Sequence, residues 1–207
     1  MRIAVLHLDE SCLGNGREGD NPGGTAAIIE CRTSEGVQRR DFYLSSPATT
    51  NNRMALVGAA ESLRLLAARG ARLSVLMVSD SQYLVKGMRE WVPGWVARDW
   101  RRRTGAIENL ELWRELVQAA SLHEVQWTWV RGHRGHPKNE YANDLAVLAA
   151  REQRSSGGIV ASEFPQWLAA RTAKGQFAGY DPDADFAELE RRVASGRRFP
   201  LSEEVRA

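Results

Sequence analysis

Two aspartates of this 207-residue chain stand where predicted strands end, so their carboxylates can lie at the edge of a sheet. Asp9 lies near the end of an alternating run that begins at Ile3 and leads into a Gly/Asn-rich turn at Gly14. Asp80 follows the short apolar run from Leu73 to Val78. A lone aspartate at such a place is more often a turn or cap residue. A carboxylate at the sheet surface is nevertheless open to a metal ion or a substrate, and oxygen is the ligand that hard cations prefer.

The elements that must position these acids alternate in type along the chain. Periodicity predicts strands at residues 3–12, 25–29, 37–44, 73–78 and 125–130, and helices after Thr49, after Ser81 to about Trp91, at 108–120 and at 137–150. We expect Pro93-Gly94 to interrupt the second helix. The order predicts an α/β (α+β) fold, in which a five-stranded mixed sheet is flanked by helices.

A change of composition near Ser155 predicts two parts, a domain at residues 1–152 and a C-terminal extension at 153–207. The extension holds one or two short helices and too few apolar residues for a core of its own. We therefore expect it to pack on the domain or to be partly mobile.

The composition indicates the cellular compartment of the protein more clearly than its activity. The two cysteines lack the spacing of a disulfide framework or metal site, and no run could serve as a signal peptide or span a bilayer, so we expect a cytoplasmic protein without membrane contact. The net charge of +2 alone does not indicate a nucleic-acid binder. The stretch from Trp91 to Arg103 interleaves tryptophans with arginines. A solvated face is the usual explanation of such an arginine run, whereas the interleaved tryptophans and the motifs described below favour a polyanionic partner.

Five stretches together resemble the ribonuclease H type HI family over roughly residues 1–151. They are Asp9-Glu-Ser-Cys-Leu-Gly-Asn15, Thr49-Thr-Asn-Asn-Arg-Met54, Ser79-Asp-Ser-Gln-Tyr83, Asn109-Leu-Glu-Leu-Trp113 and Trp129-Val-Arg-Gly-His-Arg-Gly-His-Pro-Lys-Asn-Glu140. The resemblance implies an endonuclease that hydrolyses the RNA strand of RNA/DNA hybrids with two Mg²⁺ or Mn²⁺ ions. Two cations suit this reaction because they generate the nucleophile and neutralise the leaving oxygen.

The resemblance assigns catalytic roles residue by residue, with two departures. Asp9 and Asp80 match two of four metal-binding acids, and His133 matches a loop histidine that assists proton transfer or product release. At the other two acidic positions stand Ala55 and Asn143, which weaken the expected site. Asn143 still offers an uncharged oxygen to a metal, whereas Ala55 offers nothing. Either both are engineered substitutions, or they belong to a divergent branch.

Other acids are candidates for the missing ligand. Asp144 neighbours Asn143, but one residue along a helix turns a side chain by about 100°, so we place Asn143 in the site and Asp144 beside it. Glu61 faces away from Ala55 for the same reason. Glu10 adjoins Asp9, although adjacent strand residues point to opposite faces unless a bulge intervenes. Glu10 therefore stays a candidate metal ligand, and a substrate phosphate is another.

By the same resemblance, a second set of residues binds the hybrid. Short polar side chains contact the minor groove and detect 2′-hydroxyls: Cys12, Asn15, Asn51, Asn52 and Gln82. Thr50 binds a phosphate. The basic protrusion contributes Trp91, Arg98 and Arg101. Helix capping is the alternative role for the asparagine pair, and core packing for the other tryptophans of the protrusion.

Three hypotheses compete. The first is a monomeric ribonuclease H, and the second is a catalytically inactive module that binds RNA/DNA hybrids or double-stranded RNA. The third, a transposase or integrase of similar fold, is disfavoured by the Gly-His-x-Gly-His-Pro loop and the basic protrusion. Asp9, Asp80 and His133 together favour the enzyme, because a binding module needs none of them.

Overall fold

The computed structural model describes residues 2–14, 21–68, 70–132, 135–199 and 202–203. The strands are β1 (Ile3–Cys12), β2 (Gly23–Thr33), β3 (Gly36–Ser46), β4 (Ser74–Ser79), β5 (Glu124–Val130), β6 (Val160–Ala161) and β7 (Ser202–Glu203). The helices are α1 (Asn51–Ala67), α2 (Gln82–Lys86), the π-helical turn η1 (Gly87–Trp91), α3 (Val92–Val96), α4 (Leu110–Ala120), α5 (Pro137–Glu152), α6 (Phe164–Thr172) and α7 (Pro182–Ala194).

The strands form one mixed sheet in the order β6-β3-β2-β1-β4-β5-β7. Strand β1 is central: it pairs antiparallel with β2 and parallel with β4, and β4 pairs parallel with β5. The prediction of an α/β fold with a mixed sheet is confirmed. The predicted count of five strands was low, because the extension adds a two-residue strand at each edge of the sheet.

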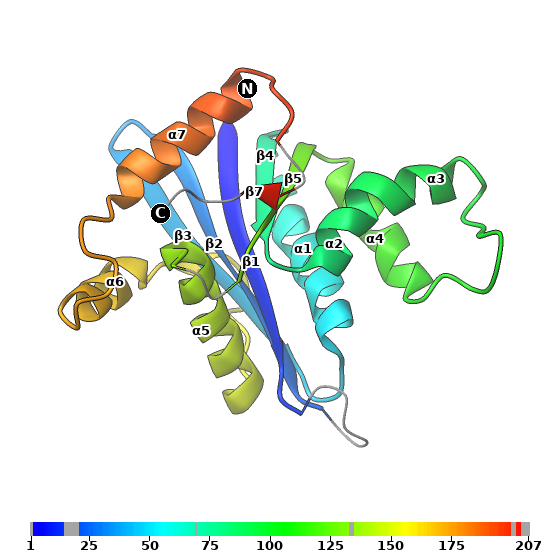
Figure 1. Cartoon of the computed structure of the whole chain (residues 1–207), viewed down its shortest axis with the longest axis horizontal. Coiled ribbons are helices and arrows are strands. Elements are labelled where there is room, and N and C mark those ends of the chain that lie inside the picture. Colours follow the sequence, from blue (N-terminus) through cyan, green and yellow to red (C-terminus); the bar gives the residue numbers. More distant parts are fainter. Residues whose placement is uncertain (1, 15–20, 69, 133–134, 200–201, 204–207) are drawn as a thin grey trace.

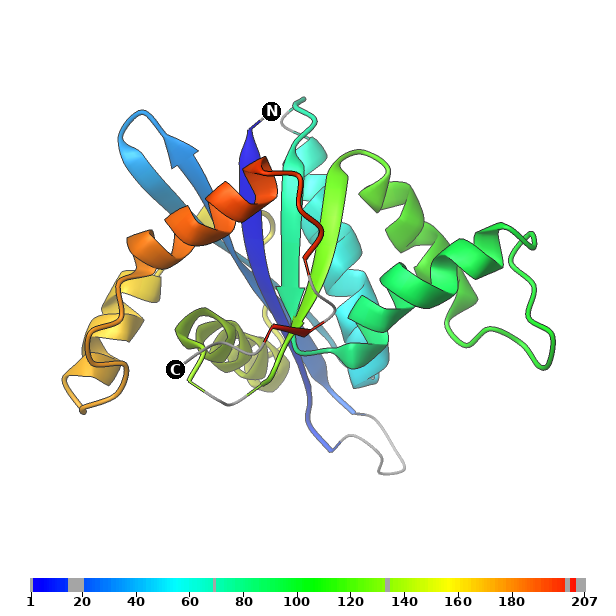
Figure 2. The ribbon, with the colours of Figure 1, turned by 45° about the horizontal axis from the view of Figure 1, so that its top comes forward.

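Helices cover both faces of this sheet, with α1 and α4 on one side and α5 and α7 on the other (Figures 1 and 2). Alternation along β1 sends Leu6 and Leu8 into the core under α1 and α4, while Val5 packs with the apolar side chains of α7. The same alternation assigns Asp9 to the face of α5 and α7, and Glu10 to the face of α1.

Pro93 does not end the second helix, contrary to the prediction. Helix α2 continues through η1 into α3, which ends at Val96. Pro93 lies in the first turn of α3 and directly follows the π-helical turn, where the backbone already departs from α-helical hydrogen bonding. The helical arm therefore runs unbroken from the sheet into the basic protrusion.

The described residues of the extension pack against the sheet. Phe186 and Val193 of α7 pack with Val5 and Leu76, and Phe199 joins the same cluster. No helix within the described ranges is long and apolar enough to cross a membrane.

A buried ion cluster also joins the extension to the domain. Lys138 Nζ lies 2.7 Å from a carboxylate oxygen of Glu30 and 2.7 Å from one of Asp185 on α7. Lys138 and Glu30 are almost fully buried, so their charges must be paired within the protein.

Candidate active site

The end of β1 places two adjacent acids beyond the end of β4. Leu8 pairs with Ser79, the last residue of β4, so Asp9 and Glu10 have no strand neighbour on that side. Their pairing with β2 is regular, Asp9 with Ala26 and Glu10 with Thr25, so no bulge intervenes. Asp80 follows β4 directly and lies beside both acids.

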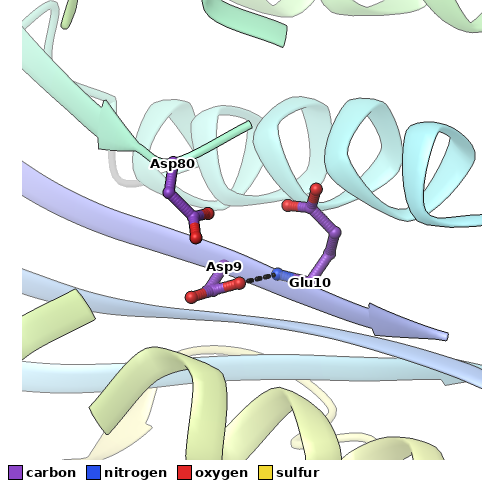
Figure 3. A group of neighbouring side chains, drawn as sticks. All are labelled: Asp9, Glu10 and Asp80. Carbon is purple, nitrogen blue, oxygen red and sulfur yellow. Dashed lines mark hydrogen bonds between the residues drawn. The ribbon is translucent and has the colours of Figure 1, made fainter. Parts of the chain in front are cut away.

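Three carboxylates gather at this point (Figure 3). Asp9, Glu10 and Asp80 each offer an oxygen, and these oxygens lie within 4.8 Å of one another. Glu10 lies on the α1 face of β1, as alternation requires. Its longer side chain nevertheless brings the carboxylate level with Asp80, because β4 has already ended. The length of the Glu10 side chain, rather than a bulge in β1, therefore brings together carboxylates from the two faces of the strand.

Neighbouring groups hold the three acids in place. Asn139 Nδ2 donates to Asp9 Oδ2 at 2.8 Å, and the backbone N–H of Glu10 donates to Asp9 Oδ1 at 2.7 Å. The indole Nε1 of Trp129 donates to the backbone carbonyl of Asp80 at 2.8 Å. A Cβ on Gly132 would overlap the Asp80 carboxylate, so any other residue there would displace that carboxylate.

The acids repel one another in a partly dry environment. Burial, followed by the charges of Asp80 and Glu10, raises the pKa of Asp9 well above its usual range. Burial, followed by the charge of Asp80, raises the pKa of Glu10 to about 8, against a hydrogen bond from Ser81 that lowers it. Oε2 of Glu10 is buried and has no hydrogen-bond partner among the described residues. A cation at this point would relieve each of these costs, and the all-oxygen donor set fits a divalent metal.

Ala55 and Asn143, which stand at the two expected acidic positions, lie on α1 and α5. Ala55 is fully buried among the apolar side chains of the α1 face and offers no ligand atom. Asn143 is half-buried on α5, four residues after Asn139, and so lies one turn further along the face that meets Asp9. Asp144 accepts from Trp167 Nε1 at 2.8 Å and from Arg171 at 2.6 Å. Helix α6 thus holds Asp144 in an interaction of its own.

Three of the predicted minor-groove residues, Asn51, Asn52 and Gln82, lie at the start of α1 or α2, and the predicted phosphate-binding residue Thr50 directly precedes α1. Thr50 caps α1 by accepting from the N–H of Arg53, Asn51 and Asn52 form the first turn, and Gln82 is exposed at the start of α2. The thiol of Cys12 donates to the carbonyl of Thr49 at 3.3 Å and so joins the end of β1 to the segment before α1. Asn15 and His133 lie outside the described residues.

Trp91 belongs to an aromatic cluster at the base of the protrusion. Its ring centroid lies 5.7 Å from that of Tyr83 and 6.0 Å from that of Trp95. Trp91 and Arg98 line a 530 Å³ groove there, whereas Arg101 is exposed beside Asp99. The groove therefore combines aromatic faces with arginine side chains.

Sequence reasoning missed Asn139, Ser81 and Gly132 as residues that hold the acids. Asn139 and Gly132 stand within the quoted motif around His133, but only their contacts reveal what they do. Ser81 follows Asp80 directly, and no pattern shows that it reaches Glu10.

Comparison with known proteins identifies the family. The model of the family RNase H matches residues 2–151. This chain belongs to the RNase H family. The Ribonuclease H of Aromatoleum aromaticum is 43% identical over 158 residues, which cover 75% of this chain and 95% of that protein. The Ribonuclease H of Pelobacter propionicus is 41% identical over 152 residues, covering 73% of this chain and 86% of the relative.

Solved structures agree on the fold. The crystal structure of LC9-RNase H1, a type 1 RNase H with the type 2 active-site motif, matches with a TM-score of 0.79 and 42% identity, covering 100% of this chain and 98% of that one. The foamy viral protease-reverse transcriptase in complex with RNA/DNA hybrid shares the fold, with a TM-score of 0.60 at 14% identity, over 72% of this RNase H and 20% of that chain. The family match makes this RNase H an enzyme of the class that hydrolyses RNA in RNA/DNA hybrids with divalent metal ions.

Proposed function

We propose that this RNase H hydrolyses the RNA strand of RNA/DNA hybrids at the cluster of Asp9, Glu10 and Asp80, with Asn143 as an uncharged fourth ligand. Two Mg²⁺ or Mn²⁺ ions at these oxygens would supply the activated water and neutralise the leaving oxygen. The observation that carries the proposal is the convergence of the three carboxylate oxygens within 4.8 Å.

Glu10 takes the place of the missing acid on α1. Its carboxylate comes from the α1 face of β1, the face that Ala55 also lines. This arrangement favours natural divergence over engineering as the origin of Ala55, because an engineered alanine would not account for a glutamate at position 10. LC9-RNase H1 provides a precedent for a type 1 RNase H with an active-site motif of the other type.

The other residues of the site position the acids and add no charge of their own. Asn139 fixes one oxygen of Asp9 and leaves the other facing Glu10, while Trp129 anchors the backbone at Asp80. For substrate binding, we propose Asn51, Asn52 and Gln82 on the 2′-hydroxyl side. We propose Thr50 with the Trp91 groove, Arg98 and Arg101 on the phosphate side, and His133 at the scissile phosphate.

The raised pKa values predict how metal binding depends on pH. Below about pH 8 the proton on Glu10 must be displaced by the metal, whereas above that pH it is already lost. We therefore expect Mn²⁺ to bind more tightly as pH rises from 6 to 9, measured by isothermal titration calorimetry. In Glu10→Gln the rise should be shallower, because only the Asp9 proton still competes. An equal rise in both proteins would contradict this assignment.

The test of the function is cleavage of a labelled RNA/DNA hybrid at low salt with Mg²⁺, with Mn²⁺ and with EDTA. We expect cleavage of the RNA strand with either metal and none with EDTA. Labelled single-stranded RNA and duplex DNA are the controls and should stay intact. Binding of the hybrid without cleavage in either metal would instead support the hypothesis of an inactive binding module.

A further inference from the structure

Four arginines surround a shallow depression at the end of α7, outside the catalytic cluster. It has a volume of 540 Å³ and is lined by Glu188, Arg191, Arg192, Ser195, Arg197 and Arg198. We call these residues the C-terminal patch. They lie beyond residues 2–151, the part of the chain that the family model matches.

The patch is held in shape by the buried residues around it. Val193 and Phe199 are buried in the cluster beneath α7, on either side of Arg197 and Arg198. Gly196, with a φ of 66°, turns the chain at the end of the helix. The N–H of Arg197 then donates to Ser195 Oγ at 3.3 Å. The arginines that follow the helix are therefore anchored at both ends.

Most of the positive charge of the patch is not neutralised locally. Among the described residues no carboxylate lies within ion-pair distance of Arg191, Arg197 or Arg198, all of which are exposed. Three acids of α7 pair outside the patch, Glu190 with Arg32, Asp183 with Arg39 and Asp185 with Lys138, and Glu188 is the one acid that lines it.

A fifth arginine adds to the positive charge around the C-terminal patch. Arg89 of η1 donates to the carbonyl of Trp127 at 3.0 Å, which fixes it beside β5. Burial, followed by the charge of Arg198, lowers the pKa of Arg89. Attraction to the negative end of the helix dipole is the ordinary reason for arginines in a last turn. It accounts for Arg191 and Arg192, but not for Arg197 and Arg198 beyond the helix, nor for Arg89.

The chain itself links the patch to the catalytic acids. The N–H of Phe199 donates to the Gln126 side chain of β5, and Ser202 pairs with Trp129, whose indole donates to Asp80. Trp129 is three residues after Gln126 on β5, a rise of about 10 Å. Since phosphates of one strand follow one another at about 3.4 Å along a duplex, a hybrid extended by a few nucleotides spans this distance.

We propose that the C-terminal patch binds phosphates of the nucleic acid that flanks the segment held in the active site. This inference rests on the proposed binding of hybrids, but not on the metal site. The extension would then lengthen the footprint on substrate, and long hybrids would bind more tightly than short ones. Arg191, Arg197 and Arg198 supply the contacts, while Arg192 stacks at 4.5 Å on the ring of Phe199 and supports the fold.

The experiment compares two variants of the full chain that each lose three positive charges. The patch variant is Arg191→Gln/Arg197→Gln/Arg198→Gln. The control is Arg72→Gln/Arg151→Gln/Lys174→Gln, which removes exposed charges elsewhere. Dissociation constants are measured in EDTA by fluorescence anisotropy, over a range of salt, for hybrids of about 8 and about 25 base pairs. Melting curves confirm that both variants fold.

For the patch variant we expect the long hybrid to bind at least about tenfold more weakly at low salt. The slope of log affinity against log salt should be smaller by about 0.9 for each phosphate that an arginine no longer neutralises. The short hybrid should bind as it does to the control. Equal binding of the long hybrid by patch variant and control would overturn the inference and favour an acidic protein as the partner of these arginines. If the unmodified chain bound neither hybrid, the proposed function itself would fail.

Discussion

Glu10→Gln is expected to lower kcat for hybrid cleavage by about 10³-fold, because the site loses one of three charged metal ligands. Glutamine keeps the size and one oxygen of the side chain but neither its charge nor its raised pKa. The folded, metal-free variant should be no less stable, since a carboxylate whose pKa is raised to about 8 destabilises the protein as pH rises from its usual range toward 8. Single-turnover kinetics and melting curves check the two expectations.

Moving the carboxylate from position 10 to position 55 gives a sharper test of Glu10 as a metal ligand. Ala55→Glu alone should change kcat little, because Glu10 already supplies the charge. Combined with Glu10→Gly, it should restore much of the activity that Glu10→Gly loses. Glu61→Gln is the matched control, since Glu61 pairs with Arg64 on the outside of α1 and should leave kcat unchanged. Full activity of Glu10→Gln, or a large gain from Ala55→Glu alone, would show that Glu10 is not a ligand.

Phe186→Ala is expected to lower Tm by about 10 °C, because it opens a cavity between α7 and the sheet. Phe186 is fully buried against the face of β1 and β4 that carries Val5 and Leu76. Deletion of the whole extension should lower Tm further, since it also leaves Lys138 and Glu30 without Asp185. Differential scanning calorimetry with and without metal measures both changes.

Phe177→Ala serves as the comparison for Phe186→Ala. Phe177 is half-buried and stacks on Trp167, with ring centroids 5.7 Å apart. Its removal should lower Tm by less than half as much. Equal shifts for the two variants would mean that α7 does not complete the core. A drop in Tm for Phe186→Ala with unchanged kcat at low temperature would separate stability from catalysis.

The sequence allowed prediction of whatever depends on local periodicity. Asp9 and Asp80 could be placed at strand ends because apolar alternation marks the strands, and the 100° step of a helix separated Asn143 from Asp144. The position of Glu10 could not be predicted in this way. Strand alternation assigns its direction correctly, but the end of β4 and the length of the glutamate side chain decide where the carboxylate arrives.

The contacts made by the extension could not be predicted either. Its composition showed that it lacked a core of its own, yet nothing in it indicated which face of the sheet Phe186 would cover. Two-residue strands such as β6 and β7 have no periodicity to detect. Pro93 misled the prediction because apolar periodicity does not reveal the π-helical turn that precedes it and changes the local hydrogen bonding.

The two short edge strands also bear on how the protein is made. Strand β6 pairs with two residues of β3 and β7 with two residues of β5, so the C-terminal extension covers part of each edge of a sheet whose other strands all precede residue 131. During synthesis the amino-terminal part emerges first, with both edges still open. Open edges invite pairing with other chains. Until residue 203 has been made, the nascent chain therefore exposes more unpaired strand edge than the finished protein does.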